Sequence, residues 1–159
     1  MESKHESTIR FYRSGDEYGI FSNFARYPVA LDGKLWPTTE HYFQAQKFIG
    51  TEDEYAEQIR NAPSPGDAAR MGRDRSHKLR EDWEQVKDGI MLMAVKAKFI
   101  QHEDLRAALL ATGDAILVEH TTNDSYWADG GDGSGKNMLG KILMQVRGEL
   151  RDEKTDSEL

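Results

Sequence analysis

Cysteine is missing from the chain, which excludes disulfides, thiolate metal sites and a cysteine nucleophile. No apolar run approaches the roughly 18 residues that a membrane span needs, and the first ten residues, MESKHESTIR, lack the apolar core of a signal peptide. Positive charge is not in excess either. The formal net charge of −7 argues against a protein that holds long nucleic acid by charge alone, but it permits a local basic pocket for a small phosphorylated ligand. We therefore expect a cytoplasmic protein that does not enter the membrane.

The 159 residues suit one domain with one hydrophobic core. Their pattern predicts a mainly α (α+β) protein, a single helical domain over residues 8–150 with a small N-terminal β-hairpin and short strands. The polar ends, residues 1–7 and 151–159, are expected to be disordered. Strands are expected at residues 8–12 and 115–118, with a hairpin turn at Asp32-Gly33. Helices are expected over residues 39–49, 52–60, 83–101, 103–111 and 137–150, with a further short one after Ser64.

The helix expected after Trp36 carries a polar stripe among aromatic side chains. On a wheel of 100° per residue, Glu40, Gln44 and Lys47 fall within a sector of about 60°. Apolar groups occupy most of the circumference, whereas a surface helix shows a wide polar face. One interpretation is a mostly buried helix whose polar stripe lines a cavity. The alternative is an exposed stripe in which Gln44 links two surface charges and Glu40 serves the helix dipole.

A glycine-rich loop precedes the last expected helix. Its segment Gly130–Lys136 matches GxxxxGK, but Asn137 replaces the serine or threonine that would hold magnesium in a P-loop. The spacing of a calcium-binding EF-hand is also incomplete. The remaining reading is a loop with Trp127 and Asp129 that leads into a helix N-terminus, where an anion or a sugar hydroxyl is favoured. An ordinary solvent loop is the alternative.

The segment Arg70–Arg80 concentrates six basic side chains in an otherwise acidic chain. Clustered arginines bind phosphate oxygens through forked hydrogen bonds, although a solvated charge run is the alternative. The five histidines show no metal-ligand spacing, and no Gly-x-Ser-x-Gly elbow supports a serine hydrolase. Asn23, between Phe21 and Phe24, is either a ligand-binding amide or a satisfied core amide.

Three motifs occur in order: GIFSNF at residues 19–24, LWPTTEHYFQAQKF at 35–48 and YWADGGDGSGKNMLGKILMQVR at 126–147, with ARMGRDRSHKLREDWEQVK between the last two. In this pattern the chain resembles the YbiA-like N-glycosidases of the NADAR superfamily, from about Thr8 to Leu150. The resemblance implies a mainly helical fold and hydrolysis of an N-glycosidic bond. The implied substrates are early riboflavin-pathway intermediates, 5-amino-6-(5-phosphoribosylamino)uracil and its 2,5-diamino pyrimidinone precursor, which release ribose 5-phosphate. Other branches resemble enzymes that remove ADP-ribose from modified guanine in nucleic acid.

Both substrate classes join ribose to an exocyclic amine, and such a glycosylamine can open to an imine at C1. One hypothesis makes Lys47 the nucleophile that forms a Schiff base, because its apolar neighbours favour the neutral amine, while Glu40 moves protons. The rival hypothesis places an oxocarbenium-like transition state between Asp129 and Glu40, and Lys47 then only binds the sugar or phosphate. Neither scheme implies a metal or redox cofactor.

The predicted partner of the protein is a small phosphorylated N-riboside. Aromatic rings are expected to stack on the pyrimidine, amides to hold hydroxyls or base edges, and arginines to take the 5′-phosphate. The predicted substrate-binding residues are Phe21, Asn23, Gln44, Arg70, Arg73, Trp127 and Asn137. A non-catalytic binder of ADP-ribose or a nucleotide is the alternative from another class, but Glu40, Lys47 and Asp129 together favour an enzyme. The sequence does not indicate an oligomeric state.

Overall fold

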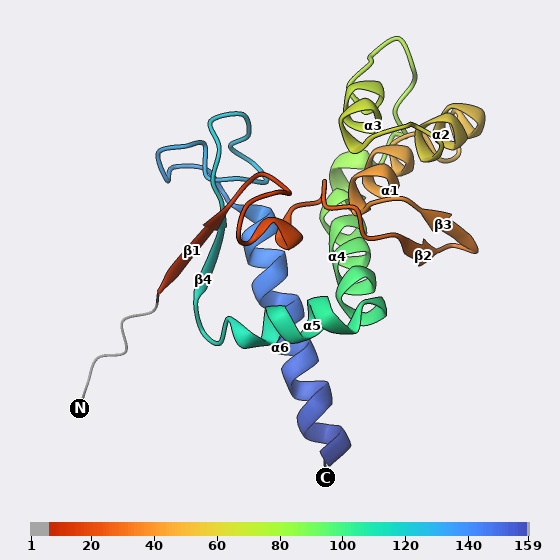
Figure 1. The fold of residues 1–159 in the computed structure, drawn as a ribbon. Coiled ribbons are helices and arrows are strands. Elements are labelled where there is room, and N and C mark those ends of the chain that lie inside the picture. The colour runs from red at the N-terminus through yellow and green to blue at the C-terminus, as the bar shows by residue number, and fades with distance from the viewer. Residues whose placement is uncertain (1–6, 159) are drawn as a thin grey trace. The chain divides into compact units, whose positions relative to one another are not determined.

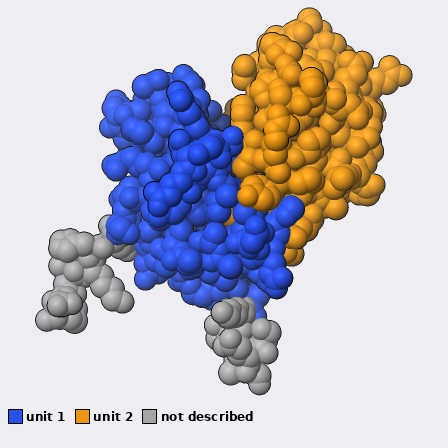
Figure 2. Space-filling view, in the orientation of Figure 1, with its two compact units in different colours: residues 1–22, 102–159 blue, residues 23–101 orange. Residues whose placement is uncertain are grey.

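The structure is a computed structural model that describes residues 7–158 (Figure 1). Contacts divide the chain into two compact units, and the single domain over residues 8–150 stays a prediction. Unit 1 comprises residues 1–22 and 102–159, and unit 2 comprises residues 23–101 (Figure 2). Residues 1–6 of the predicted disordered N-terminus lie outside the described residues. Within the described part, no helix is both long and apolar enough to cross a membrane.

Unit 2 is built around one short helix that the rest of the unit covers. Helix α1 (Thr39–Gln46) contacts α2 (Asp53–Arg60), α3 (Pro65–Gly72) and α4 (Trp83–Gln101). Every residue of α1 is buried, which confirms the prediction of a buried helix and makes the exposed-stripe alternative wrong. A helix that is enclosed on all sides places even its polar side chains inside the protein.

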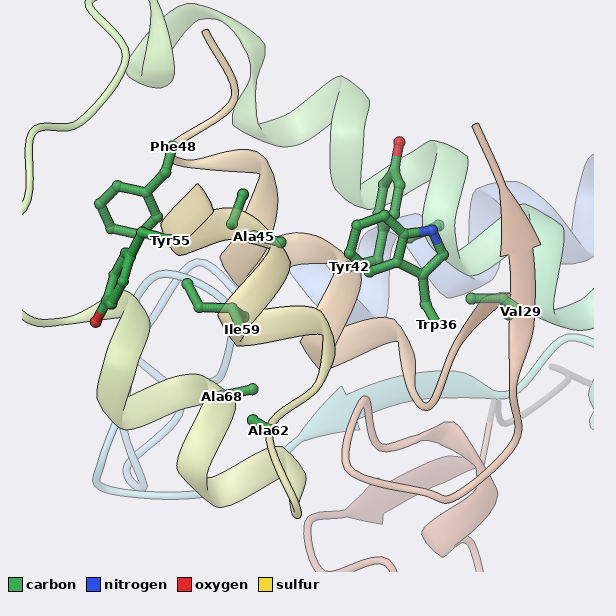
Figure 3. Packing of buried hydrophobic residues seen from close by; sticks show 11 residues of the cluster. Val29, Trp36, Tyr42, Ala45, Phe48, Tyr55, Ile59, Ala62 and Ala68 are labelled. Atoms are coloured by element: carbon green, nitrogen blue, oxygen red, sulfur yellow. The ribbon is translucent and has the colours of Figure 1, made fainter. Parts of the chain in front are cut away.

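The core of unit 2 is rich in aromatic rings, as Figure 3 shows. Trp36 meets Tyr42 edge-on with ring centroids 5.1 Å apart, and Phe48 meets Tyr55 in the same way at 5.0 Å. Edge-to-face contacts of this kind add to the stabilisation that burial of the rings provides. The aromatic residues that the sequence placed around the polar stripe therefore anchor α1 among its neighbours.

Local signals in unit 2 match the structure closely. The hairpin joins β2 (Val29–Leu31) to antiparallel β3 (Lys34–Trp36). Its two turn residues have positive φ, 56° at Asp32 and 75° at Gly33, as a two-residue turn of the predicted kind requires. Helix α3 begins with Pro65 after Ser64, whose side chain accepts a hydrogen bond from the backbone N–H of Asp67.

Helix α1 ends earlier than the sequence predicted, at Gln46 instead of Ile49. The N–H groups of Lys47 and Phe48 bond to carbonyls three residues back, so the last turn tightens and the α-helix stops. The N–H of Arg80 then caps the carbonyl of Lys47 at 2.8 Å. Lys47 is thus the residue that closes α1, and a distant segment of the chain fixes that end.

Unit 1 contains β1 (Thr8–Phe11), the 3-10 turn η1 (Gly19–Phe21), α5 (Glu103–Ala111), β4 (Ile116–Glu119) and α6 (Met138–Glu158). Strands β1 and β4 pair in parallel, with Thr8 opposite Ile116. Helix α6 packs against β4 and α5 (Figure 1). A Cβ atom at Gly140 would lie 2.0 Å from the carbonyl oxygen of Leu117, so glycine permits this close approach of helix and strand.

Helix α6 extends beyond its predicted end at Leu150 and continues to Glu158. The sequence predicted disorder for residues 151–159, but residues 151–158 are helical, and residue 159 lies outside the described residues. Glutamate, lysine and arginine are good helix formers, so a charged segment can prolong a helix that the core has already nucleated.

Candidate functional site

Glu40 and Gln44 form a buried pair one turn apart on α1. The Nε2 atom of Gln44 donates a hydrogen bond of 2.8 Å to Oε2 of Glu40. The remaining amide oxygen of Gln44 is buried without a hydrogen-bond partner and faces Gly72, where a Cβ atom would lie only 1.9 Å from it. Gly72 therefore makes room for the amide that holds the carboxyl group of Glu40.

Lys47 reaches from the end of α1 to the end of α3. Only 7% of its surface is exposed, and its Nζ atom donates a hydrogen bond of 3.3 Å to the carbonyl oxygen of Gly72. The same Nζ atom lies 5.9 Å from the ring centre of Phe43 and 6.0 Å from that of Trp83. The amine is thus enclosed by aromatic rings and held by one backbone carbonyl.

Burial lowers the pKa of Lys47 to about 8, and the positive charge of Arg75 acts in the same direction. Arg73 and Lys87 also lower this pKa, whereas the negative charge of Glu40 raises it. Desolvation disfavours the ammonium form, and three nearby cations add to that effect. Near neutral pH, the buried amine therefore has a substantial neutral fraction that can act as a nucleophile.

The arginines in the last turn of α3 and just after it have different surroundings. Arg70 is largely exposed and pairs with Asp67 at 2.6 Å. Arg73 closes α3 and is exposed, and its charge lowers the pKa of Lys47. Arg75, which the sequence did not single out, donates a hydrogen bond of 3.0 Å to the carbonyl oxygen of Gly72. The phosphate roles of Arg70 and Arg73 stay predictions.

Asn23 has partners inside unit 2. Its Oδ1 atom accepts a hydrogen bond of 2.8 Å from Thr39, and its Nδ2 atom lies 3.4 Å from the sulfur atom of Met91. Its backbone carbonyl also accepts from the N–H of Glu40 at 3.2 Å. Asn23 therefore holds the first turn of α1, in agreement with the interpretation as a satisfied core amide, and a role in substrate binding stays a prediction.

Asp129 lies in unit 1, where it organises the glycine-rich loop. Its carboxylate accepts hydrogen bonds from the backbone N–H groups of Thr121 at 3.1 Å and Gly131 at 2.8 Å, and it is hydrogen-bonded to Nδ1 of His120 at 2.7 Å. Burial acts to raise the pKa of Asp129, but these hydrogen bonds outweigh it and hold the pKa below its ordinary value. The group is ionised near neutral pH, which suits a base better than an acid.

The remaining predicted residues of unit 1 also have local roles. Asn137, with a φ of 52°, accepts from the N–H of Glu119 at 3.0 Å and donates to the carbonyl of Leu117 at 2.9 Å, so its amide extends the hydrogen bonding of β4. Phe21 is fully buried and meets Phe11 edge-on at 5.8 Å. Trp127 is half-buried. Their roles in binding stay predictions.

The structure gathers one set of site residues within unit 2, which we call the lysine site: Glu40, Gln44, Lys47, Gly72 and Arg75. Three of these were predicted from the stripe on α1. Gly72 and Arg75 were missed as individuals, although both lie in the basic motif ARMGRDRSHKLR that the sequence highlighted. The lysine site joins a carboxyl group, an amide and an amine, a combination that permits proton transfer and nucleophilic attack. Among the described residues, no group of three or more histidine, aspartate or glutamate side chains could hold a metal ion.

The chain is similar over most of its length to several known proteins. The chain is 58% identical to the N-glycosidase YbiA of Escherichia coli over 149 residues, which cover 94% of this chain and 92% of that protein. The NMR structure of the E. coli protein matches with a TM-score of 0.87, at 57% identity over 96% of this chain and 90% of that chain. An N-glycosidase of Nostoc punctiforme is 46% identical over 91% of this chain and 93% of its own length.

A longer relative bears a name from riboflavin biosynthesis. A riboflavin biosynthesis protein of Vibrio vulnificus is 40% identical over 92% of this chain, which spans 40% of that protein. The model of the NADAR domain matches residues 10–151, nearly the whole chain. The motifs, the fold and these matches lead to one assignment: the chain belongs to the NADAR family.

Proposed function

We propose that the protein hydrolyses the bond between ribose 5-phosphate and the exocyclic amine of an early riboflavin-pathway pyrimidine. The coarser statement, that the protein is a hydrolase acting on N-glycosyl bonds, rests on its family and on its similarity to two curated N-glycosidases. The similarity to the Vibrio protein, named for riboflavin biosynthesis, supports the choice of pyrimidine substrates. We take 5-amino-6-(5-phosphoribosylamino)uracil and its 2,5-diamino pyrimidinone precursor as the substrates.

The buried amine of Lys47 is the observation that carries the proposed mechanism. Lys47 is only 7% exposed, and its pKa of about 8 reflects both burial and the charges around it. Lys98 is buried more deeply, so burial by itself does not mark a nucleophile; the amine of Lys47 in addition feels the charge of the Glu40 carboxyl group and of three cations. A neutral amine beside a carboxyl group is what covalent catalysis at a sugar aldehyde needs. Glu40 supplies that carboxyl group, held by Gln44.

The proposed reaction has two stages. The sugar ring of the glycosylamine opens to an imine, the nitrogen of Lys47 bonds to C1, and the C1–N bond to the pyrimidine breaks, so the pyrimidine leaves as its free amine. Water then adds to the lysine–sugar Schiff base, releasing ribose 5-phosphate and restoring the lysine amine. Glu40 carries the protons that the ring oxygen and the departing amine require.

The rival scheme needs no covalent intermediate. A carboxylate activates water for direct attack at the anomeric carbon, while a second carboxyl group protonates the departing amine. The lowered pKa of Asp129 suits the base in this scheme, and Glu40 would be the acid. In that scheme Lys47 only binds the sugar or phosphate, a task that makes no use of its lowered pKa, and for this reason we favour the Schiff base.

A direct substrate comparison tests the proposal. Purified protein is offered the phosphoribosylamino-pyrimidine and, separately, ADP-ribosylated guanine in an oligonucleotide, and released ribose 5-phosphate and ADP-ribose are measured by mass spectrometry. We expect ribose 5-phosphate from the first and little ADP-ribose from the second. Preferential release of ADP-ribose would overturn the choice of substrate, and binding without release from either would overturn the assignment of catalysis.

A further inference from the structure

The carbonyl oxygen of Gly72 accepts two cationic donors. Nζ of Lys47 lies 3.3 Å from it, and Nη1 of Arg75 lies 3.0 Å from it. Gly72 is the last residue of α3, where backbone carbonyls lack partners within the helix and the helix dipole favours positive charge. A carbonyl oxygen has two lone pairs, so both donors can bind it at once.

This sharing matters when Lys47 reacts. For its nitrogen to attack a sugar, the amine has to leave the carbonyl that holds it. A carbonyl held by Lys47 alone would then lose its donor in a buried place, which is costly. Arg75 keeps the carbonyl bonded throughout, because a guanidinium does not lose its proton and takes no part in the covalent step.

The positive charges around Lys47 also favour its reactive, neutral amine. The groups that influence the amine come from each element around it: Glu40 from α1, Arg73 and Arg75 from the segment after α3, and Lys87 from α4. Of the three cations, Arg75 has the strongest effect in lowering the pKa of Lys47. It is also the one that shares an acceptor with this amine.

We propose that Arg75 is a positioning residue for the lysine nucleophile: it keeps the Gly72 carbonyl hydrogen-bonded when the amine of Lys47 leaves that carbonyl to attack the sugar. This inference rests on the proposed function, since it requires that the amine of Lys47 reacts. Two plainer roles make different predictions. An arginine that only caps α3 would affect stability alone, and an arginine that only binds phosphate would affect the Michaelis constant alone.

The test compares Arg75→Gln with Arg75→Lys, and with Arg106→Gln as a control that removes an arginine from unit 1. For each protein, kcat and KM for the phosphoribosylamino-pyrimidine are measured from pH 6 to 10. We expect the acid limb of kcat/KM to move up by about one pH unit in Arg75→Gln, so that activity falls about tenfold at pH 7 and recovers at high pH. Arg75→Lys keeps a positive charge and should move the limb less, and Arg106→Gln should leave it unmoved.

A second measurement does not depend on turnover. The rate at which Lys47 is acetylated by acetic anhydride, followed by mass spectrometry across the same pH range, reports the pKa of its amine directly. A higher labelling pKa in Arg75→Gln supports the inference even if the pyrimidine is not hydrolysed, an outcome that would overturn the proposed function alone. An unmoved pKa with an equal loss of kcat at every pH, or a change confined to KM, would overturn the inference. Arg75→Met replaces the glutamine variant if that variant unfolds.

Discussion

The reactivity of Lys47 is the property on which the covalent mechanism depends, and pH controls it. With a pKa of about 8, about one tenth of the Lys47 amines are neutral at pH 7. An ordinary lysine with a pKa of 10.5 has about one neutral amine in 3,000 at that pH. Burial and the neighbouring cations therefore raise the neutral, nucleophilic fraction of Lys47 at pH 7 about 300-fold, which corresponds to about 3 kcal/mol.

Measuring kcat/KM against pH tests this value, because that ratio reports ionisations of the free enzyme. We expect a rise of about tenfold per pH unit below pH 8 and a plateau above it. Lys47→Arg should lower kcat/KM by on the order of 10³-fold, because a guanidinium keeps the charge but is not a nucleophile. Borohydride added during turnover should attach the sugar to the peptide that contains Lys47, with the same pH dependence.

Lys34→Arg provides the matched control, since Lys34 is half exposed and pairs with Glu57 at 3.0 Å. This variant should keep the full rate and the same profile. Circular dichroism of both variants checks that a loss of rate is not a loss of fold. The reasoning is refuted if normal turnover gives no trapped adduct, or if Lys47→Arg retains a rate close to that of the parent protein.

Three further predictions concern groups around or apart from the lysine site. Gly72→Ala should destabilise the protein by about 1–3 kcal/mol and lower activity, because the new Cβ atom would displace the buried glutamine of α1. Gly66→Ala in the same helix is the control, since a Cβ atom there would have no side-chain atom nearer than 3.7 Å. Its free energy of unfolding in urea should stay within about 1 kcal/mol of that of the parent protein. Asp129→Asn should cost about 1–3 kcal/mol of stability, because it weakens three hydrogen bonds, and His120→Asn should cost less. If folded Asp129→Asn instead loses 10²–10⁴-fold in kcat, the carboxylate scheme is favoured. Burial lowers the pKa of Lys98 to about 7, so between pH 7 and 10 this group adds up to about 1.4 kcal/mol of stability per pH unit, because the unfolded chain binds more protons. Lys47 adds a similar slope above pH 8. In urea titrations Lys98→Met should therefore remove the slope that these lysines give between pH 7 and 8 and about half of it between pH 8 and 10, and an unchanged slope would contradict this.

Much of the fold could be predicted from the sequence, because the sequence signals of turns, caps and helices each span only a few residues. The hairpin at Asp32-Gly33, the cap at Ser64 and the long helix over residues 83–101 all agree with the structure. Turn residues, caps and helical periodicity express backbone preferences of the segment itself, so they can be recognised without knowing what surrounds it. The end of α6 was misjudged for the opposite reason, because charged residues do not reveal whether a packed helix continues through them.

Sequence alone also determined that Glu40, Gln44 and Lys47 lie within one sector of a helical segment, but it left open whether that sector is buried. Only the tertiary structure decided what those groups touch. The acceptor for Lys47 is a carbonyl 25 residues further along the chain, and the parallel partner of β1 lies beyond residue 115. Such contacts depend on how separate elements pack, and no local preference encodes them. The physical consequence is that the sequence supplied an amine and a carboxyl group, whereas packing gave the amine its lowered pKa and its place beside Arg75.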